Sequence, residues 1–224
     1  SQLSGCLKNS NTICMNGQPI ANDLENLIGR PVRLENDANC FALAEAIDGA
    51  GKNAGSVLGI ILGTGVGAGI VINRTLLKGL HYIAGEWGHN VLEADGPLCY
   101  CGNNGCVETF LSGPGLLADY VRQGGGTSVD ATTVATRAVH DPAARAALNV
   151  CLDRFGRALA MVINILDPDL VVLGGGLSNI ESLYIEGRQR TALHVFNEDF
   201  RTPIVPNSHG DSGGVRGAAL LWPE

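Results

Sequence analysis

The 224-residue sequence predicts an α/β protein. Residues 56–62 (SVLGIIL) and 69–73 (GIVIN) are apolar and rich in β-branched side chains, which is typical of strands. Residues 133–164 are rich in alanine and carry apolar side chains at helical spacing. Residues 170–173 (LVVL) form a third apolar run, which ends in three glycines and precedes a helix candidate. Strands, glycine turns and helices in this succession favour an α/β architecture.

The remaining elements follow in order along the chain. Residues 1–31 are polar and rich in turn residues, and the two apolar runs form a β-hairpin around the glycine-rich turn at 63–67. Helices are expected at 21–27, 38–49, 133–164 (one or two, ended by 167–169), from about residue 180, and at 213–221. Further strands are expected at 32–34 and 203–207.

Composition narrows the class of protein. Hydrophobic residues make up 45% and charged residues 17%, as in a globular protein. The formal net charge is −7 and no basic cluster occurs, so nucleic-acid binding by this chain is not expected. No apolar stretch approaches the roughly 20 residues of a membrane span, so no membrane partner is expected. The expected location is the cytoplasm, as a soluble protein. The seven cysteines are an odd number, which favours reduced thiols and a metal site over a fully paired set of disulfides.

Three of these cysteines and one histidine form a compact motif. His89, Cys99, Cys101 and Cys106 lie within 18 residues, and Gly102 and Gly105 allow the tight backbone that a thiolate knuckle needs. Four such ligands suit tetrahedral zinc and close its coordination shell, so the metal is expected to be structural. Reduced cysteines without a metal, or a redox pair, are the alternative.

Two acidic residues flank this motif. Glu86 lies three residues before His89, and Glu108 lies two residues after Cys106. Carboxylates on a rigid support are suited to accept hydrogen bonds from sugar hydroxyls. The alternative is that both are ordinary surface acids.

Two glycine-rich turns are candidate phosphate-binding segments. Their backbone N–H groups can approach an anion closely, and strand ends in α/β sheets are where ligands dock. A plain hairpin turn is an equally common reason for such glycines. The residues concerned are Gly63, Thr64, Gly65, Val66 and Gly67 in the first turn, and Gly174, Gly175 and Gly176 in the second.

Asp37 lies at a predicted strand-to-helix junction, within Glu35-Asn36-Asp37-Ala38-Asn39. A carboxylate there can act as a general base that takes the proton of a substrate hydroxyl during phosphoryl transfer. Capping of the helix N-terminus is the alternative role.

Taken together, four ordered motifs resemble the ROK family of repressors, open reading frames and sugar kinases. The resemblance runs from about residue 8 to the C-terminus, and this range includes two further matching segments, 167–176 and 209–217. The motifs are residues 35–39 (ENDAN), 62–67 (LGTGVG), 85–89 (GEWGH) and 99–108 (CYCGNNGCVE). The resemblance implies an actin-like, ribonuclease H-like fold in two lobes, with ATP and sugar meeting in the cleft. Residues 85–90 and 219–224 are most similar to the fructokinases of the family.

The resemblance also implies roles for single residues. Asp37 matches the catalytic base and Asn36 its sugar-binding neighbour. Glu86, His89 and Glu108 match sugar contacts, and His89 is also a zinc ligand. Residues 63–70 match the second phosphate-binding segment, and residues 174–176 match a turn near adenosine. The implied reaction transfers the γ-phosphoryl group of ATP to a hexose hydroxyl, and Mg²⁺ is the implied cofactor of ATP. For fructose, the hydroxyl is the one at position 6.

One family feature is not found in the sequence. Members of the family open with a strand and an Asp-x-Gly-Gly-Thr loop that holds phosphate and magnesium. We therefore expect an incomplete N-terminal lobe and little or no kinase activity from this chain alone. The expected division is a small-lobe remnant at 1–45, with 205–224 packing back on it, and a large lobe with the zinc site at 46–204.

Several alternatives stay open at this level. The substrate could instead be N-acetylglucosamine or glucose. The chain could also belong to a sugar-sensing repressor of the family, or to a binding protein without catalysis. The resemblance further implies a homodimer.

Overall fold

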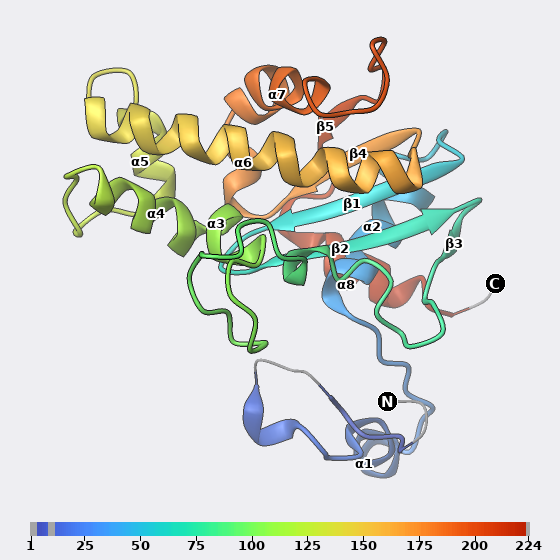
Figure 1. The fold of residues 1–224 in the computed structure, drawn as a ribbon. Coiled ribbons are helices and arrows are strands. Elements are labelled where there is room, and N and C mark those ends of the chain that lie inside the picture. The colour runs from blue at the N-terminus through green and yellow to red at the C-terminus, as the bar shows by residue number, and fades with distance from the viewer. Residues whose placement is uncertain (1–3, 9–11, 223–224) are drawn as a thin grey trace.

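The computed structural model describes residues 4–8 and 12–222, and its centre is a five-stranded mixed sheet (Figure 1). The strand order is β3-β2-β1-β4-β5. β1 pairs antiparallel with β2 and parallel with β4, so the hairpin forms one half of the sheet and the parallel strands the other. The strands are β1 (Ser56–Leu62), β2 (Val66–Ile72), β3 (Thr75–Leu76), β4 (Leu170–Gly174) and β5 (Ile204–Pro206).

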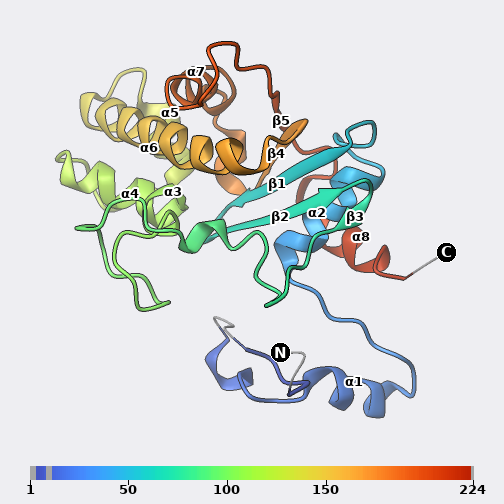
Figure 2. The same ribbon diagram turned by 45° about the vertical axis from the view of Figure 1, so that its right-hand side comes forward.

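Helices cover both faces of this sheet (Figure 2). The 25-residue helix α6 (Pro142–Leu166) lies across one face, and α2 (Asp37–Ile47) lies on the other with α8 (Gly213–Ala219) beside it. β1 serves both faces because successive side chains alternate: Leu58 and Ile60 join the core under α6, and Val57 joins the core under α2. The other helices are α1 (Ile20–Ile28), α3 (Glu108–Leu111), α4 (Gly113–Arg122), α5 (Ala131–Arg137) and α7 (Arg188–Ala192).

Glycines let α2 lie close to the sheet. A Cβ at Gly59 would come within 2.7 Å of the Cβ of Ala42, and one at Gly69 within 2.7 Å of the carbonyl oxygen of Ala38. Neither position has room for a larger residue. The close contact fixes the start of α2 relative to the hairpin.

Most predicted elements are confirmed, with shifted boundaries. The hairpin turn is shorter than expected, because Leu62 pairs with Val66 and β2 therefore begins there. The region 133–164 is two helices, α5 and α6, each started by an aspartate whose side chain accepts backbone N–H groups. The helix expected from residue 180 begins instead as a π-helical turn, Leu183–Gly187, before α7.

The strand expected at 32–34 is wrong. Among the described residues these three pair with no strand, and the N–H of Val32 donates to Oε1 of Glu25 at 2.8 Å. A strand needs a neighbour for its backbone groups, and apolar residues alone do not provide one. Residues 4–8 and 12–34, with α1, lie apart from the sheet in both views, and α1 buries none of its side chains.

The C-terminal segment packs against α2. Arg216 of α8 pairs with Asp48, with 2.7 Å between Nη2 and Oδ2, and a Cβ at Gly217 would overlap the backbone of Cys40. The buried carboxylate of Glu45 accepts the N–H groups of Ser208 and His209. Residues 1–3, 9–11 and 223–224 of the expected small-lobe remnant and closing segment lie outside the described residues. Within the described part, no helix has the length and apolar character needed to cross a bilayer.

Candidate functional site

A cavity of about 700 Å³ brings together most of the predicted site residues. It lies where three segments meet: the start of α2, the glycine turn at 63–67, and residues 89–108, which carry the predicted metal ligands and are called the metal-ligand loop below. Its lining includes every predicted base, sugar-contact and first-turn residue: Asn36, Asp37, Gly63, Thr64, Gly65, Val66, Gly67, Glu86, His89 and Glu108. Apolar side chains complete the wall. They belong to Leu7, Leu34, Ile61, Tyr82 and Ile83.

The N-terminus of α2 presents Asn36 and Asp37 in different ways. Asn36 is the N-cap, and its Oδ1 accepts the N–H groups of Ala38 and Asn39 at 2.9 and 3.2 Å. Asp37 is the first helical residue, and its Oδ1 accepts the N–H of Ala38 at 2.9 Å. Capping is therefore done mainly by Asn36, which leaves a carboxylate oxygen of Asp37 available to the cavity.

The glycine turn lies directly against the metal-ligand loop. A Cβ at Gly65 would come within 2.5 Å of Oε2 of Glu108, and one at Gly67 within 2.9 Å of the Cβ of Ala38. Only glycine permits this approach on both sides. The backbone N–H of Val66 donates to the same carboxylate oxygen at 2.9 Å.

Glu86 precedes a short 3₁₀ turn, Trp87–His89, and His89 is its last residue. Trp87 is buried, and its Nε1 donates to the carbonyl oxygen of Ala158 in α6 at 3.1 Å. Gly88 allows the turn to lie on β2, because a Cβ there would come within 2.1 Å of the carbonyl oxygen of Val66. The side chains of Glu86 and His89 are therefore held by a turn that is fixed to α6 through Trp87 and to β2 through Gly88.

The four predicted metal ligands converge. The ligand atoms of His89, Cys99, Cys101 and Cys106 all lie within 4.8 Å of one another. Cys99 Sγ is 3.6 Å from His89 Nδ1, and Cys101 Sγ is 3.6 Å from Cys106 Sγ. Around a tetrahedral zinc with bonds of about 2.0 Å to nitrogen and 2.3 Å to sulfur, ligand atoms are about 3.5–3.8 Å apart. These residues therefore fit zinc without rearrangement of the two pairs.

The thiols have an electrostatic reason to take a cation. Burial, together with the neighbouring Cys101 and Cys99 thiols, raises the pKa of Cys106 to about 12. With this pKa, the Cys106 thiol is protonated at neutral pH when no metal is bound. A divalent cation reverses the balance, because it stabilises thiolates that would otherwise repel one another.

His89 has a second partner that the sequence did not reveal. Its Nε2 lies 3.0 Å from the hydroxyl of Tyr100, and the two rings meet edge to face at 5.1 Å. Nδ1 faces the thiols, so the hydrogen bond to Tyr100 fixes the ring orientation from the other side. Tyr100 also lines the cavity. Its place between two cysteine ligands was the available signal for it.

Glycines 174–176 are not among the residues that line this cavity. Gly174 pairs with Ile61, and a Cβ at Gly175 would come within 2.6 Å of the carbonyl oxygen of Leu62. The second glycine turn therefore lies beside the first, at the carboxyl ends of β1 and β4. This is the edge of a parallel sheet where ligands dock.

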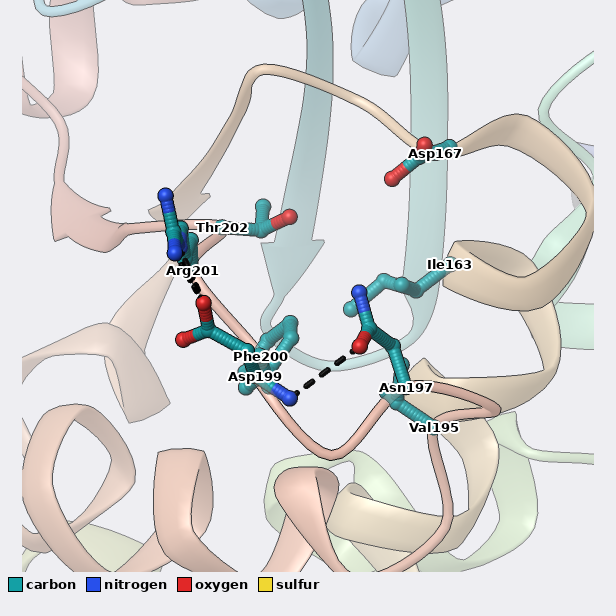
Figure 3. A pocket seen from close by; sticks show the side chains of 8 residues that line it. All are labelled: Ile163, Asp167, Val195, Asn197, Asp199, Phe200, Arg201 and Thr202. Atoms are coloured by element: carbon teal, nitrogen blue, oxygen red, sulfur yellow. Dashed lines mark hydrogen bonds and ion pairs between the residues drawn. The ribbon is translucent and has the colours of Figure 1, made fainter.

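A second cavity, of about 410 Å³, lies elsewhere (Figure 3). It opens between the end of α6 and residues 195–202, and Asp199 forms an ion pair there with Arg201. None of the predicted site residues lines it.

Comparison with known proteins decides the family. The ROK family model matches residues 1–224. The chain belongs to the ROK family. An N-acetyl-D-glucosamine kinase of Yersinia pseudotuberculosis (serotype O:3, strain YPIII) is 40% identical to this ROK chain over 215 residues, which cover 92% of this chain and 71% of the relative.

Solved structures agree with this assignment. A ROK family glucokinase from Streptomyces griseus, solved with glucose and AMPPNP, superposes with a TM-score of 0.83 at 29% identity, over 92% of this chain and 73% of that one. A ROK family transcriptional regulator, a homologue of the E. coli MLC protein, gives a TM-score of 0.82 at 26% identity, over 98% of this chain and 58% of that one. The predicted actin-like α/β fold is thereby confirmed. The fructokinase assignment within the ROK family is not supported, since the curated relative is an N-acetylglucosamine kinase.

Proposed function

We propose that this ROK chain serves as a sugar kinase that transfers the γ-phosphoryl group of ATP to a hexose, with N-acetylglucosamine as the preferred substrate. The observation that carries the proposal is the single cavity in which Asp37, Glu86 and Glu108 face the same space beside a glycine turn. The 40% identity to an N-acetylglucosamine kinase supports the choice of sugar over fructose.

The proposed roles follow from the chemistry of each side chain. Asp37 accepts the proton of the attacking sugar hydroxyl as the new O–P bond forms and the bond to ADP breaks. Asn36, Glu86 and Glu108 bind and orient the other hydroxyls. The turn at 63–67 holds phosphate oxygens through N–H groups other than those of Gly63 and Val66, which donate to the carbonyl oxygen of Gly65 and to Glu108. Mg²⁺ accompanies ATP. Glycines 174–176 are proposed to lie near the adenosine.

The proposed zinc ion is held by His89, Cys99, Cys101 and Cys106. It supplies structural support, because four protein ligands leave no open position for substrate. The chain between these ligands ends at Glu108, and His89 follows Glu86 by three residues. A fixed loop therefore fixes both carboxylates. Nε2 of His89 can contact the sugar from the same turn if a sugar hydroxyl takes the place of the Tyr100 hydroxyl.

The reaction is tested by measuring ADP release from ATP with N-acetylglucosamine, glucose, mannose and fructose. The Asp37→Asn variant removes the base, and Asp23→Asn, an exposed aspartate on α1, is the matched control. Because the sequence holds no Asp-x-Gly-Gly-Thr loop, little release is expected from this chain alone, and the assay is repeated with that loop supplied by an N-terminal fusion. In the fusion we expect N-acetylglucosamine to give the fastest ADP release, and Asp37→Asn to lower that rate at least about a hundredfold. Equal rates for Asp37→Asn and the parent would remove Asp37 from the role of base.

A sugar-sensing regulator is the second candidate, because the ROK regulator is as similar in fold as the glucokinase. The discriminating residue is Asp37, which only a kinase needs as a base. Sugar binding that survives Asp37→Asn, with no ADP release even when the Asp-x-Gly-Gly-Thr loop is supplied, would favour the regulator. Action in the cytoplasm, where ATP is available, and a homodimer remain predictions.

A further inference from the structure

The two walls of the sugar cavity come from separate elements. Asn36 and Asp37 begin α2, whereas Glu86 ends the irregular segment 77–86, which follows β3. Tyr82 and Ile83 of that segment also line the cavity. A sugar held between these walls needs a fixed spacing, since small displacements of binding groups weaken binding strongly. A contact that joins the two walls directly therefore affects affinity without touching the sugar.

Lys78 and Glu35 form such a contact. Lys78 Nζ lies 3.1 Å from Glu35 Oε2, and the Glu35 side chain is only 10% exposed. The ammonium also lies 5.9 Å from the centre of the Tyr82 ring, within cation–π range. Lys78 thus ties the start of the segment 77–86 both to the residue before Asn36 and to a side chain of the cavity wall.

Glu35 also forms hydrogen bonds with the start of α2, and so connects Lys78 to that helix. Its Oε1 accepts the backbone N–H of Asn36 and the side-chain Nδ2 of Asn39, both at 3.0 Å. Burial tends to raise the pKa of Glu35, but these two hydrogen bonds and the Lys78 ammonium outweigh it and hold the pKa below its usual value. Both carboxylate oxygens are engaged, so Glu35 is a positioning residue and not a second base.

We propose that the Lys78–Glu35 ion pair positions the segment 77–86 against Asn36 and Asp37 and thereby sets the affinity for the sugar. This inference rests on the proposed function. The second lysine near the cavity, Lys8, reinforces the arrangement, because its Nζ donates to the carbonyl oxygen of His81 at 3.2 Å. The acidic groups that face the cavity are Glu35, Asp37, Glu86 and Glu108, so removal of Lys78 leaves a largely uncompensated cluster of carboxylates.

The test compares Lys78→Met with Lys78→Arg, which keeps the charge. Lys52→Met, an exposed lysine in the turn after α2, is the matched control. Calorimetric titration with N-acetylglucosamine should give a Kd about tenfold higher for Lys78→Met than for the parent. Lys78→Arg and Lys52→Met should stay within about twofold of the parent. The double variant Glu35→Gln/Lys78→Met should be no weaker than the weaker single variant, because the two residues act as one unit.

Hydrogen exchange of the sugar-free chain gives a readout that does not depend on the substrate. Amides of 77–86 should exchange faster in Lys78→Met, but not in Lys78→Arg or Lys52→Met. An unchanged Kd and unchanged exchange in Lys78→Met would overturn the inference. If the parent binds no hexose, the proposed function fails, and the exchange of 77–86 still decides whether the ion pair holds the segment.

Discussion

The carboxylate of Glu108 accepts the backbone N–H of Val66, with 2.9 Å between Oε2 and the nitrogen. Its other oxygen lies 3.9 Å from Sγ of Cys99. One side chain thus connects the metal-ligand loop to the glycine turn proposed to hold phosphate. Glu108 has a structural role in addition to the sugar contact proposed for it, and the two roles can be separated by substitution.

Glu108→Gln is expected to keep the fold and lose sugar affinity. The amide retains a carbonyl acceptor for Val66 but not the charge, so the Kd for N-acetylglucosamine should rise about tenfold or more. Glu108→Ala should in addition lose about 1–3 kcal/mol of unfolding free energy. Calorimetry and urea unfolding measure the two effects, with Glu186→Gln, an exposed glutamate, as control. Equal sugar affinity in Glu108→Gln and the parent would restrict Glu108 to its structural role.

Metal removal is expected to affect sugar binding before nucleotide binding. The chain should hold about one zinc per molecule by elemental analysis. Chelation should weaken sugar binding first, because His89 and both glutamates depend on the loop. Cys101→Ser should lose the metal, and Cys14→Ser, which is equally an exposed cysteine, should keep it. Retention of a full zinc equivalent by Cys101→Ser would contradict the proposed ligand set.

Arg154 is expected to be a main support of the metal-ligand loop. It is buried, pairs with Glu93 of the loop at 2.9 Å and with Asp119 of α4 at 2.7 Å, and lies over the ring of Phe110. Arg154→Met removes the buried cation between Asp119 and Glu93, and leaves Asp119 with only Arg122 and Glu93 with only Arg157. It should cost about 3–5 kcal/mol of unfolding free energy. Arg122, whose half-exposed side chain pairs with the same buried Asp119, is the control. Arg122→Met should cost at most about 1 kcal/mol, because Arg154 still pairs with Asp119. Similar losses in both variants would show that the buried pairing is not decisive.

The same ion pairs predict an acid-sensitive stability. The hydrogen bond from Arg154 is the main reason why the pKa of Glu93 lies below its usual value of 4.5; burial opposes this, and Arg157 assists Arg154. A carboxyl with a lowered pKa stabilises the folded state above its unfolded pKa, and that stabilisation is lost as the pH falls through the folded pKa. Stability should therefore fall as the pH drops below about 4.5.

Glu93→Gln tests this assignment. It should be less stable than the parent at pH 7 and show a shallower loss between about pH 5 and pH 3. Urea unfolding in the presence of a chelator, at each pH, removes the contribution of metal ligands from both proteins. Parallel pH curves for the variant and the parent would assign the acid sensitivity to other groups.

The sequence predicted those parts of the site that depend on neighbours in the chain. The metal ligands lie within 18 residues, and the hairpin around 63–67 is a local structure with its own glycine signal. Helix α4 is not among the predicted elements, although Ser112 and Pro114 form a standard start signal.

Other features depend on residues that are distant in the chain. Arg154 and Glu93 are 61 residues apart, and Lys78 and Glu35 are 43 apart, so only the fold brings either pair together. The strand expected at 32–34 failed for the same reason, since pairing depends on a partner strand. Local patterns predict ligands and turns, whereas the contacts that hold them in place are set by tertiary packing.

The cavity beside Asp37 is proposed to bind an amino sugar, and a calorimetric titration of the zinc-loaded chain decides whether it does. N-acetylglucosamine should bind more tightly than glucose or fructose, and Glu86→Gln should weaken its binding about tenfold or more. Tighter binding of fructose than of N-acetylglucosamine, or no binding of any hexose, would contradict the claim.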